Sequence, residues 1–196
     1  MNKWFIWFCY FVRLKPPPRD NLAEYLDYLI PKVRYYGEDL VETEYYLGKR
    51  WNEYRTSSPD VILHIFDPKM NGASGSDHLR VTNGDVSMGS WSFMEGNKMI
   101  IQHPNQELYD LSFLNDHFFI VRKHGSNNTG YKSKYLVLIS PGSLRSLMSQ
   151  ALGTSEVSVE TMAELLYLYY VYNNFIAGFI IFIVPVLIVI LYIIFG

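Results

Sequence analysis

The stretch "NGDVSMGSWSFMEGNKMIIQHPNQELYDLSFLNDHFFIVRK", residues 83–123, decides the fold of this chain. Short runs of β-branched and aromatic residues alternate there with turn signals, which are Asn83-Gly84-Asp85, Gly96-Asn97, Pro104-Asn105 and Asn115-Asp116. Asn-Gly and similar pairs tolerate positive φ and form tight hairpins. We therefore predict four antiparallel strands, over residues 87–95, 98–103, 107–113 and 118–124.

The same texture continues on both sides of this stretch. Strands are predicted over 61–67 and 78–82 upstream, and over 134–140 downstream. Seven short strands joined by short turns favour one strongly curved sheet or a small barrel. A barrel removes the exposed edges that a flat sheet would leave.

Helices are predicted on both sides of the strands. Asp20 is expected to cap a helix that carries Leu22, Tyr25, Leu26 and Leu29 on one face, and Pro31 is expected to end or kink it. Further helices are predicted over 38–47, over 141–153, and from near Thr161, where T-M-A-E matches a capping box. The fold class is therefore α+β: a small antiparallel β-meander or barrel flanked by helices, with one C-terminal transmembrane helix.

That last helix is predicted from the apolar segment Phe175–Gly196, which carries no charged residue. Its length is enough to cross a bilayer core about 30 Å thick, and membrane helices tolerate a proline such as Pro185. The tyrosines at 167, 169, 170 and 172 are expected at the membrane–water interface. The anchor would include Phe175, Ile181, Pro185, Leu191 and Phe195, and the small residues Ala177 and Gly178 would let a partner helix pack closely.

The other end of the chain begins with a shorter apolar run, Trp4–Val12, which is too short to span a bilayer. Because lysine and arginine flank it, it suits shallow insertion at a membrane surface, or else it packs against the domain. Five segments result: 1–19 apolar and basic, 20–50 helical lead-in, 51–140 antiparallel β domain, 141–174 amphipathic helices, and 175–196 transmembrane helix. Since no cleavable signal is recognisable, we expect a single-pass membrane protein with a cytoplasmic β domain.

Three pieces of the sequence carry a family resemblance. Gly89-Ser90-Trp91 gives a G-x-W motif, "NKMIIQ" with "ELYDLSFLNDHFFIVRK" gives a strand–turn–strand run, and "LGKRWNEYR" places Gly48 before Trp51. Residues 47–140 are thereby similar to the small lipocalin-like domains of Bacteroidota. The resemblance implies a barrel around a ligand cavity. In physical terms, the tryptophan would plug one end of a small barrel, and the glycine would let a neighbouring backbone approach.

Six large apolar residues are predicted to face the barrel interior: Met88, Trp91, Phe93, Met99, Phe113 and Phe119. They would either line a cavity for a small apolar ligand or simply fill the barrel. Filling is favoured, because the interiors of small barrels are occupied by side chains.

The sequence offers no recognisable catalytic, cofactor or metal site. None of the five histidines is spaced as a metal ligand, and His64, which alternates with Ile62 and Phe66, is expected to face solvent or a partner. A net charge of −2 gives no reason to expect nucleic acid.

Two functions remain open, neither of them enzymatic. The first is a membrane-anchored interaction or adaptor protein that contacts the lipid bilayer and a membrane-protein partner. The alternative is a lipocalin-like protein that binds a small apolar ligand or lipid at the membrane.

Overall fold

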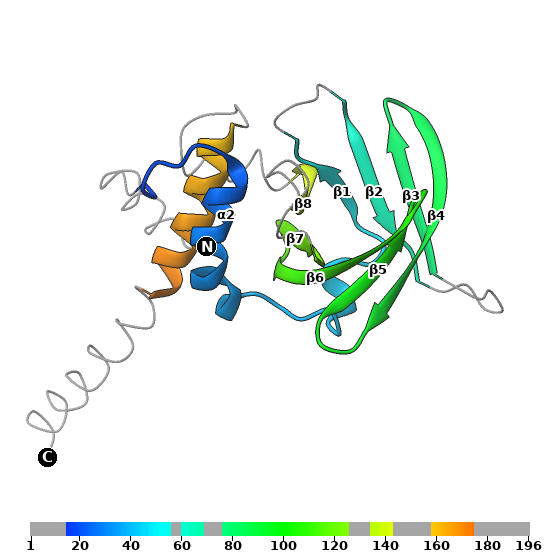
Figure 1. Cartoon of the computed structure of the whole chain (residues 1–196), viewed down its shortest axis with the longest axis horizontal. Coiled ribbons are helices and arrows are strands. Elements are labelled where there is room, and N and C mark those ends of the chain that lie inside the picture. Colours follow the sequence, from blue (N-terminus) through cyan, green and yellow to red (C-terminus); the bar gives the residue numbers. More distant parts are fainter. Residues whose placement is uncertain (1–14, 56–59, 69–75, 126–133, 143–157, 175–196) are drawn as a thin grey trace, which may run out of the picture.

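Eight antiparallel strands close into a barrel in the computed structural model of this chain, with helices on one flank (Figure 1). The structure describes residues 15–55, 60–68, 76–125, 134–142 and 158–174. Each strand pairs with the next along the chain, and β1 pairs with β8 to complete the closure. The predicted small antiparallel barrel is confirmed, and the closed eight-stranded meander is compatible with a lipocalin-like fold.

The strands have these bounds: β1 Arg50–Glu53, β2 Ile62–Phe66, β3 Ser76–Thr82, β4 Asp85–Met94, β5 Lys98–Gln102, β6 Gln106–Leu114, β7 Phe118–Lys123 and β8 Tyr135–Ile139. The turn residues behave as the hairpin pattern requires, since Asn83, Gly84, Gly96 and Asn97 all adopt positive φ. The strand that the sequence did not predict is β1, which holds Trp51 and supplies the eighth strand.

The first helix, α2 (Leu22–Val33), contains Pro31 in its last turn. Its N-cap is Asn21, one residue later than predicted, and the Asn21 side chain accepts a hydrogen bond from the Glu24 backbone N–H. The predicted helix over 38–47 is wrong. Short 3₁₀ turns, Arg34–Tyr36 and Thr43–Tyr45, occur instead, because this segment runs across one end of the barrel and buries Leu40 and Tyr46 in it.

The last described helix covers 159–174, so it begins about two residues before the predicted start. Its cap is a reciprocal pair: the Thr161 N–H donates to Ser158 Oγ and the Ser158 N–H donates to Thr161 Oγ1. The predicted helix over 141–153 is described only at 141–142, where it is helical.

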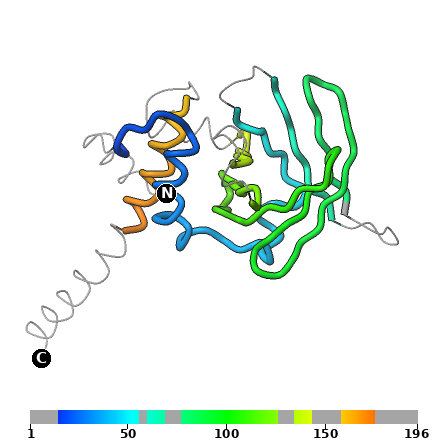
Figure 2. The backbone as a smooth tube through the Cα atoms, viewed as in Figure 1, coloured from blue at the N-terminus to red at the C-terminus, as the bar shows by residue number. Residues whose placement is uncertain are grey.

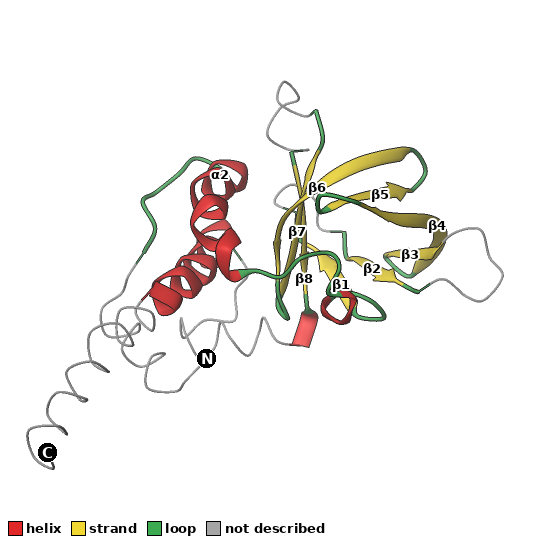
Figure 3. Ribbon diagram, turned by 90° about the horizontal axis from the view of Figure 1, so that it is seen from below, coloured by secondary structure: helices red, strands yellow, loops and turns green. Residues whose placement is uncertain are grey.

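The two helices pack together and cover the outer face of β6, β7 and β8 (Figures 2 and 3). Figure 2 shows that α2 and the helix 159–174, distant in sequence, lie side by side. Tyr169 joins the layers: its ring lies 5.5 Å from that of Phe113, and its hydroxyl donates to the Tyr36 carbonyl oxygen at 2.9 Å. This tyrosine, predicted at a membrane interface, therefore helps to pack the helix layer on the barrel.

The predicted transmembrane segment 175–196 and the N-terminal run 4–12 both lie outside the described residues. Among the residues that the structure describes, we find no helix with the length and apolar character needed to cross a membrane.

Candidate ligand-binding site

The barrel interior is divided into an apolar half and a polar half. In the apolar half, aromatic rings contact one another closely; Tyr46 lies 5.4 Å from Phe119 and 5.6 Å from Trp91 between ring centroids. The Trp51 and Trp91 indole N–H groups donate to the carbonyl oxygens of Tyr46 and Asp67. The buried residues of this half, which we call the aromatic plug, are Leu40, Tyr46, Trp51, Phe66, Trp91, Met99, Ile101, Leu111, Leu114, Phe119, Val121 and Leu138.

Three of the six predicted interior residues belong to the aromatic plug. Trp91, Met99 and Phe119 are at most 7 % exposed, which confirms their prediction. The contacts among these rings favour a filled interior at this end over a cavity for a lipid.

Of the other three predictions, those for Met88 and Phe113 are wrong, whereas Phe93 shares the inner face but lies near the end of its strand. Met88 pairs with Leu79 on the outer face of the sheet and is 69 % exposed. Phe113 is buried, but against the helices, because a β-bulge between Leu111 and Phe113 reverses which side chains point inward. Phe93 lies opposite the buried Met99, so it shares the inner face, yet it is 41 % exposed near the end of its strand.

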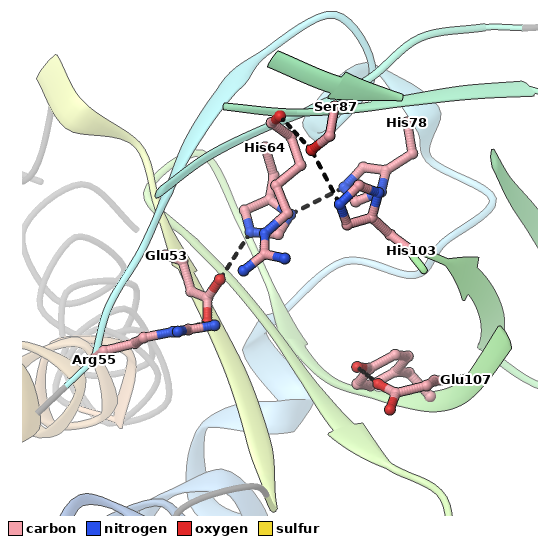
Figure 4. Close-up of polar contacts among 9 residues, drawn as sticks. Glu53, Arg55, His64, His78, Ser87, His103 and Glu107 are labelled. Atoms are coloured by element: carbon pink, nitrogen blue, oxygen red, sulfur yellow. Dashed lines mark hydrogen bonds and ion pairs between the residues drawn. The ribbon is translucent and has the colours of Figure 1, made fainter. Parts of the chain in front are cut away.

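The polar half gathers charged and polar side chains from most strands (Figure 4). Register places them together, because His64 lies opposite Arg80 and Arg80 lies opposite Ser87. Directly paired residues point to the same face. A cavity of about 140 Å³ lies among them, lined by Glu53, Arg55, His64, His78, Arg80, Ile101, His103, Glu107, Tyr109 and Leu136.

His64 lies inside the barrel, so the expectation that it faces solvent or a partner is wrong. Ile62, His64 and Phe66 are all buried, with the intervening Leu63 and Ile65 partly exposed. Every second residue of a strand points to one face, so the apolar neighbours at 62 and 66 predict an inward histidine at 64. His78 also lies inside, opposite Phe66, but its own strand gives no such signal, because the polar Ser76 and Arg80 stand two residues away on either side.

A buried hydrogen-bonded chain, Glu53–His64–His78, runs along one wall of the cavity (Figure 4). His64 Nε2 lies 3.0 Å from Glu53 Oε2, and His64 Nδ1 lies 2.9 Å from His78 Nε2. Burial disfavours the charged Glu53, but hydrogen bonds from His64 and Arg55 outweigh it and lower the pKa of this carboxyl. Burial, with His64 adjacent, lowers the pKa of His78 to about 3, so His78 is neutral near pH 7.

Two further sets of hydrogen-bonded side chains complete the polar half. The Ser87 hydroxyl is placed to donate to the Arg80 carbonyl oxygen at 3.0 Å, and its oxygen lies 3.0 Å from His103 Nε2. The Tyr109 hydroxyl donates to Glu107 at 2.5 Å, and Lys123 contacts the same carboxylate. Although burial opposes ionisation of Glu107, these two hydrogen bonds lower its pKa.

Two polar atoms of the cavity wall have no partner. His78 Nδ1 and Arg80 Nε are buried and form no hydrogen bond. His78 is only 1 % exposed, so bulk water does not satisfy it. A buried polar atom left unpaired costs about 1–3 kcal/mol. Both atoms belong to residues that line one cavity.

Gly89 of the G-x-W motif lets the end of β5 approach β4 closely beside this site. It lies opposite His78, and a Cβ built on it would lie 2.1 Å from the Gln102 carbonyl oxygen and 3.1 Å from His103 Nδ1. The expectation that this glycine permits close backbone approach is confirmed, and the group that approaches is the end of β5 with His103.

A larger cleft, of about 260 Å³, lies between α2 and the barrel, but several of its polar groups are paired. Asp27 binds Lys134 and Tyr135, Arg34 binds Asp39, and Asp110 binds His124. No cluster of three or more His, Cys, Asp or Glu residues suited to a metal ion occurs within the described ranges.

Searches with protein-family models, curated proteins and solved structures found no match to this chain. The class to which the protein belongs therefore rests on fold and site: it is an antiparallel eight-stranded β-barrel of a kind compatible with binding a small ligand.

Proposed function

We propose that this protein is a non-enzymatic binding protein that holds a small polar ligand in the polar half of its barrel. One observation carries the proposal: His78 Nδ1 and Arg80 Nε are buried and unpaired, and both residues line one cavity. A ligand that pairs with both atoms removes an energetic cost present in the empty barrel.

The size of the cavity indicates the size of the ligand. Pockets for drug-sized molecules measure roughly 300–1,000 Å³, whereas this cavity measures about 140 Å³. The ligand therefore has few non-hydrogen atoms. This argues for a polar fragment-sized molecule in place of the lipid or apolar ligand that was the alternative function from the sequence.

Catalysis is less well supported than binding. Ser87 and His103 form a hydroxyl–imidazole pair, but the Ser87 hydroxyl proton is directed at the Arg80 carbonyl oxygen. Ser87 is also not among the residues that line the cavity. A nucleophile needs a base that takes its proton and an open path to the substrate.

Arg80→Met tests the binding proposal. We expect the full chain in mild detergent to bind at least one of acetate, acetamide, urea and inorganic phosphate, with loss of affinity of about tenfold or more in Arg80→Met. The matched control is Arg122→Met, which removes an exposed arginine on the outer face of β7 and should bind normally. The measurement is isothermal titration calorimetry. If none of the four probes binds, or if both variants bind equally, the proposal fails.

We also propose that residues 175–196 tether this barrel to a membrane, with Ala177 and Gly178 available to a partner helix. The support is the sequence alone: an uncharged apolar segment of spanning length. Replacing Ile181 and Leu191 together by arginine should release the full chain from membranes washed with alkaline carbonate, since each central arginine costs about 2.5–3.5 kcal/mol. The matched control pairs Ile181→Leu with Leu191→Ile. Release of the unmodified chain by the same wash would contradict the tether.

A further inference from the structure

We infer that the ligand is a small carboxylate anion and that it enters the barrel together with one proton. This inference rests on the proposed function and follows from counting the hydrogens along the Glu53–His64–His78 chain.

In the empty barrel, the ionised Glu53 accepts a hydrogen bond from His64 Nε2–H. When His64 carries its hydrogen on Nε2 and has a lone pair on Nδ1, that lone pair accepts the hydrogen of His78 Nε2 at 2.9 Å. A neutral His78 has only one ring hydrogen, so its buried Nδ1 carries a bare lone pair. That atom is the unpaired buried nitrogen.

A carboxylate cannot pair with this arrangement, because its oxygens are acceptors only and meet another acceptor at His78 Nδ1. Arg80 nevertheless attracts an anion. The carboxylates of Glu53 and Glu107 are paired with Arg55 and Lys123. Arg80, in contrast, makes no ion pair with any described residue. The cavity therefore offers one uncompensated cation beside one nitrogen of the wrong polarity.

One added proton resolves the conflict. If the proton binds His64, the resulting imidazolium donates its Nε2–H to Glu53 and its Nδ1–H to His78 Nε2. The ring hydrogen of His78 then lies on Nδ1, where it donates to the carboxylate. If the ligand carries the proton instead, its hydroxyl donates to the lone pair of His78 Nδ1. Both arrangements take up one anion and one proton from solvent, and no covalent bond changes.

The charges around the site are consistent with this balance. Anion and proton together leave the net charge of the cavity unchanged, and the carboxylate of Glu53 faces the ring that would become cationic. The titratable or charged groups on the surrounding elements are Glu53 and Arg55 from β1 and its following loop, His64, His78 and Arg80 from β2 and β3, His103 after β5, Glu107 and Tyr109 from β6, and Lys123 from β7.

Calorimetry with acetate tests this inference. Acetate is titrated into the full chain in mild detergent at about pH 7.5, in HEPES and in Tris, whose ionisation enthalpies differ. We expect uptake of one proton per acetate and a loss of affinity of about tenfold per unit rise in pH, because one proton is linked to binding. Acetamide, which can donate its N–H to His78 Nδ1, should bind without proton uptake.

The outcomes separate the two proposals. Acetate binding without proton uptake overturns the inference and leaves the binding function standing. If neither acetate nor acetamide binds, and urea and phosphate also fail, the binding function itself is wrong.

Glu53→Gln examines the position of the proton. Without the carboxylate beside His64, acetate affinity should fall about tenfold or more and proton uptake should drop below one. The matched control is His124→Gln, which removes an exposed histidine that pairs with Asp110 outside the cavity. Thermal melting confirms that both variants fold. Unchanged acetate affinity and proton uptake in Glu53→Gln would overturn the role of this chain.

Discussion

Replacing Phe119 by alanine is expected to lower the free energy of unfolding by about 4 kcal/mol, the range typical of a fully buried phenylalanine. Phe119 is 0 % exposed, and its ring contacts those of Tyr46, Trp51 and Phe66. Removing it leaves a cavity in the aromatic plug, bordered by rigid rings that cannot easily collapse into the space.

Phe93→Ala is the matched control for this change. Both phenylalanines were predicted from the sequence to face the interior, but Phe93 is 41 % exposed. Its loss should cost about 1 kcal/mol or less. Urea titration of the full chain in mild detergent, followed by tryptophan fluorescence, measures both variants. Equal costs would contradict the filled, apolar half of the barrel.

Gly89→Ala is expected to destabilise the barrel by about 3 kcal/mol, near the upper end of overpacking costs. The added methyl group would lie 2.1 Å from the Gln102 carbonyl oxygen, which is part of the β5 backbone and cannot rotate away. The strand pair β4–β5 must then separate locally, and His103 moves with it. We therefore expect weakened acetate binding together with the loss of stability.

Gly142→Ala provides the control for a glycine-to-alanine change, because a Cβ at Gly142 meets nothing within 4 Å. Its effect on the free energy of unfolding should stay within about 1 kcal/mol. If Gly89→Ala unfolds at the same urea concentration as Gly142→Ala, the close approach of β5 to Gly89 is wrong.

The barrel could be predicted because its signals are local. Asn83-Gly84 and Gly96-Asn97 specify tight hairpins through their positive φ, and the strands between them follow from residue type. The segment 38–47 could not be predicted in this way. Its helix-like spacing is overridden by tertiary burial of Leu40 and Tyr46 in the barrel end.

The side-chain directions were predictable only in part. Strict alternation with Ile62 and Phe66 would have placed His64 inside the barrel. His78 could not be placed in this way, because its inward direction follows only from its pairing with Phe66. Phe113 shows the limit of that rule, because one bulge in β6 reverses the alternation and no turn residue marks it. The candidate site was harder still to predict: Glu53 and Arg80 come from separate strands, His103 follows a third, and they meet only when the barrel closes.

The most direct measurement is a titration with acetate of the full chain, which carries ¹⁵N-labelled histidine and is held in detergent micelles. Long-range ¹H–¹⁵N NMR follows the histidine ring nitrogens. We expect the Nδ1 resonance of His78 to shift as acetate binds, because this unpaired nitrogen gains a hydrogen-bond partner, while both nitrogens of His124 stay in place. A His78 ring that does not respond at saturating acetate would contradict a ligand site in the polar half of the barrel.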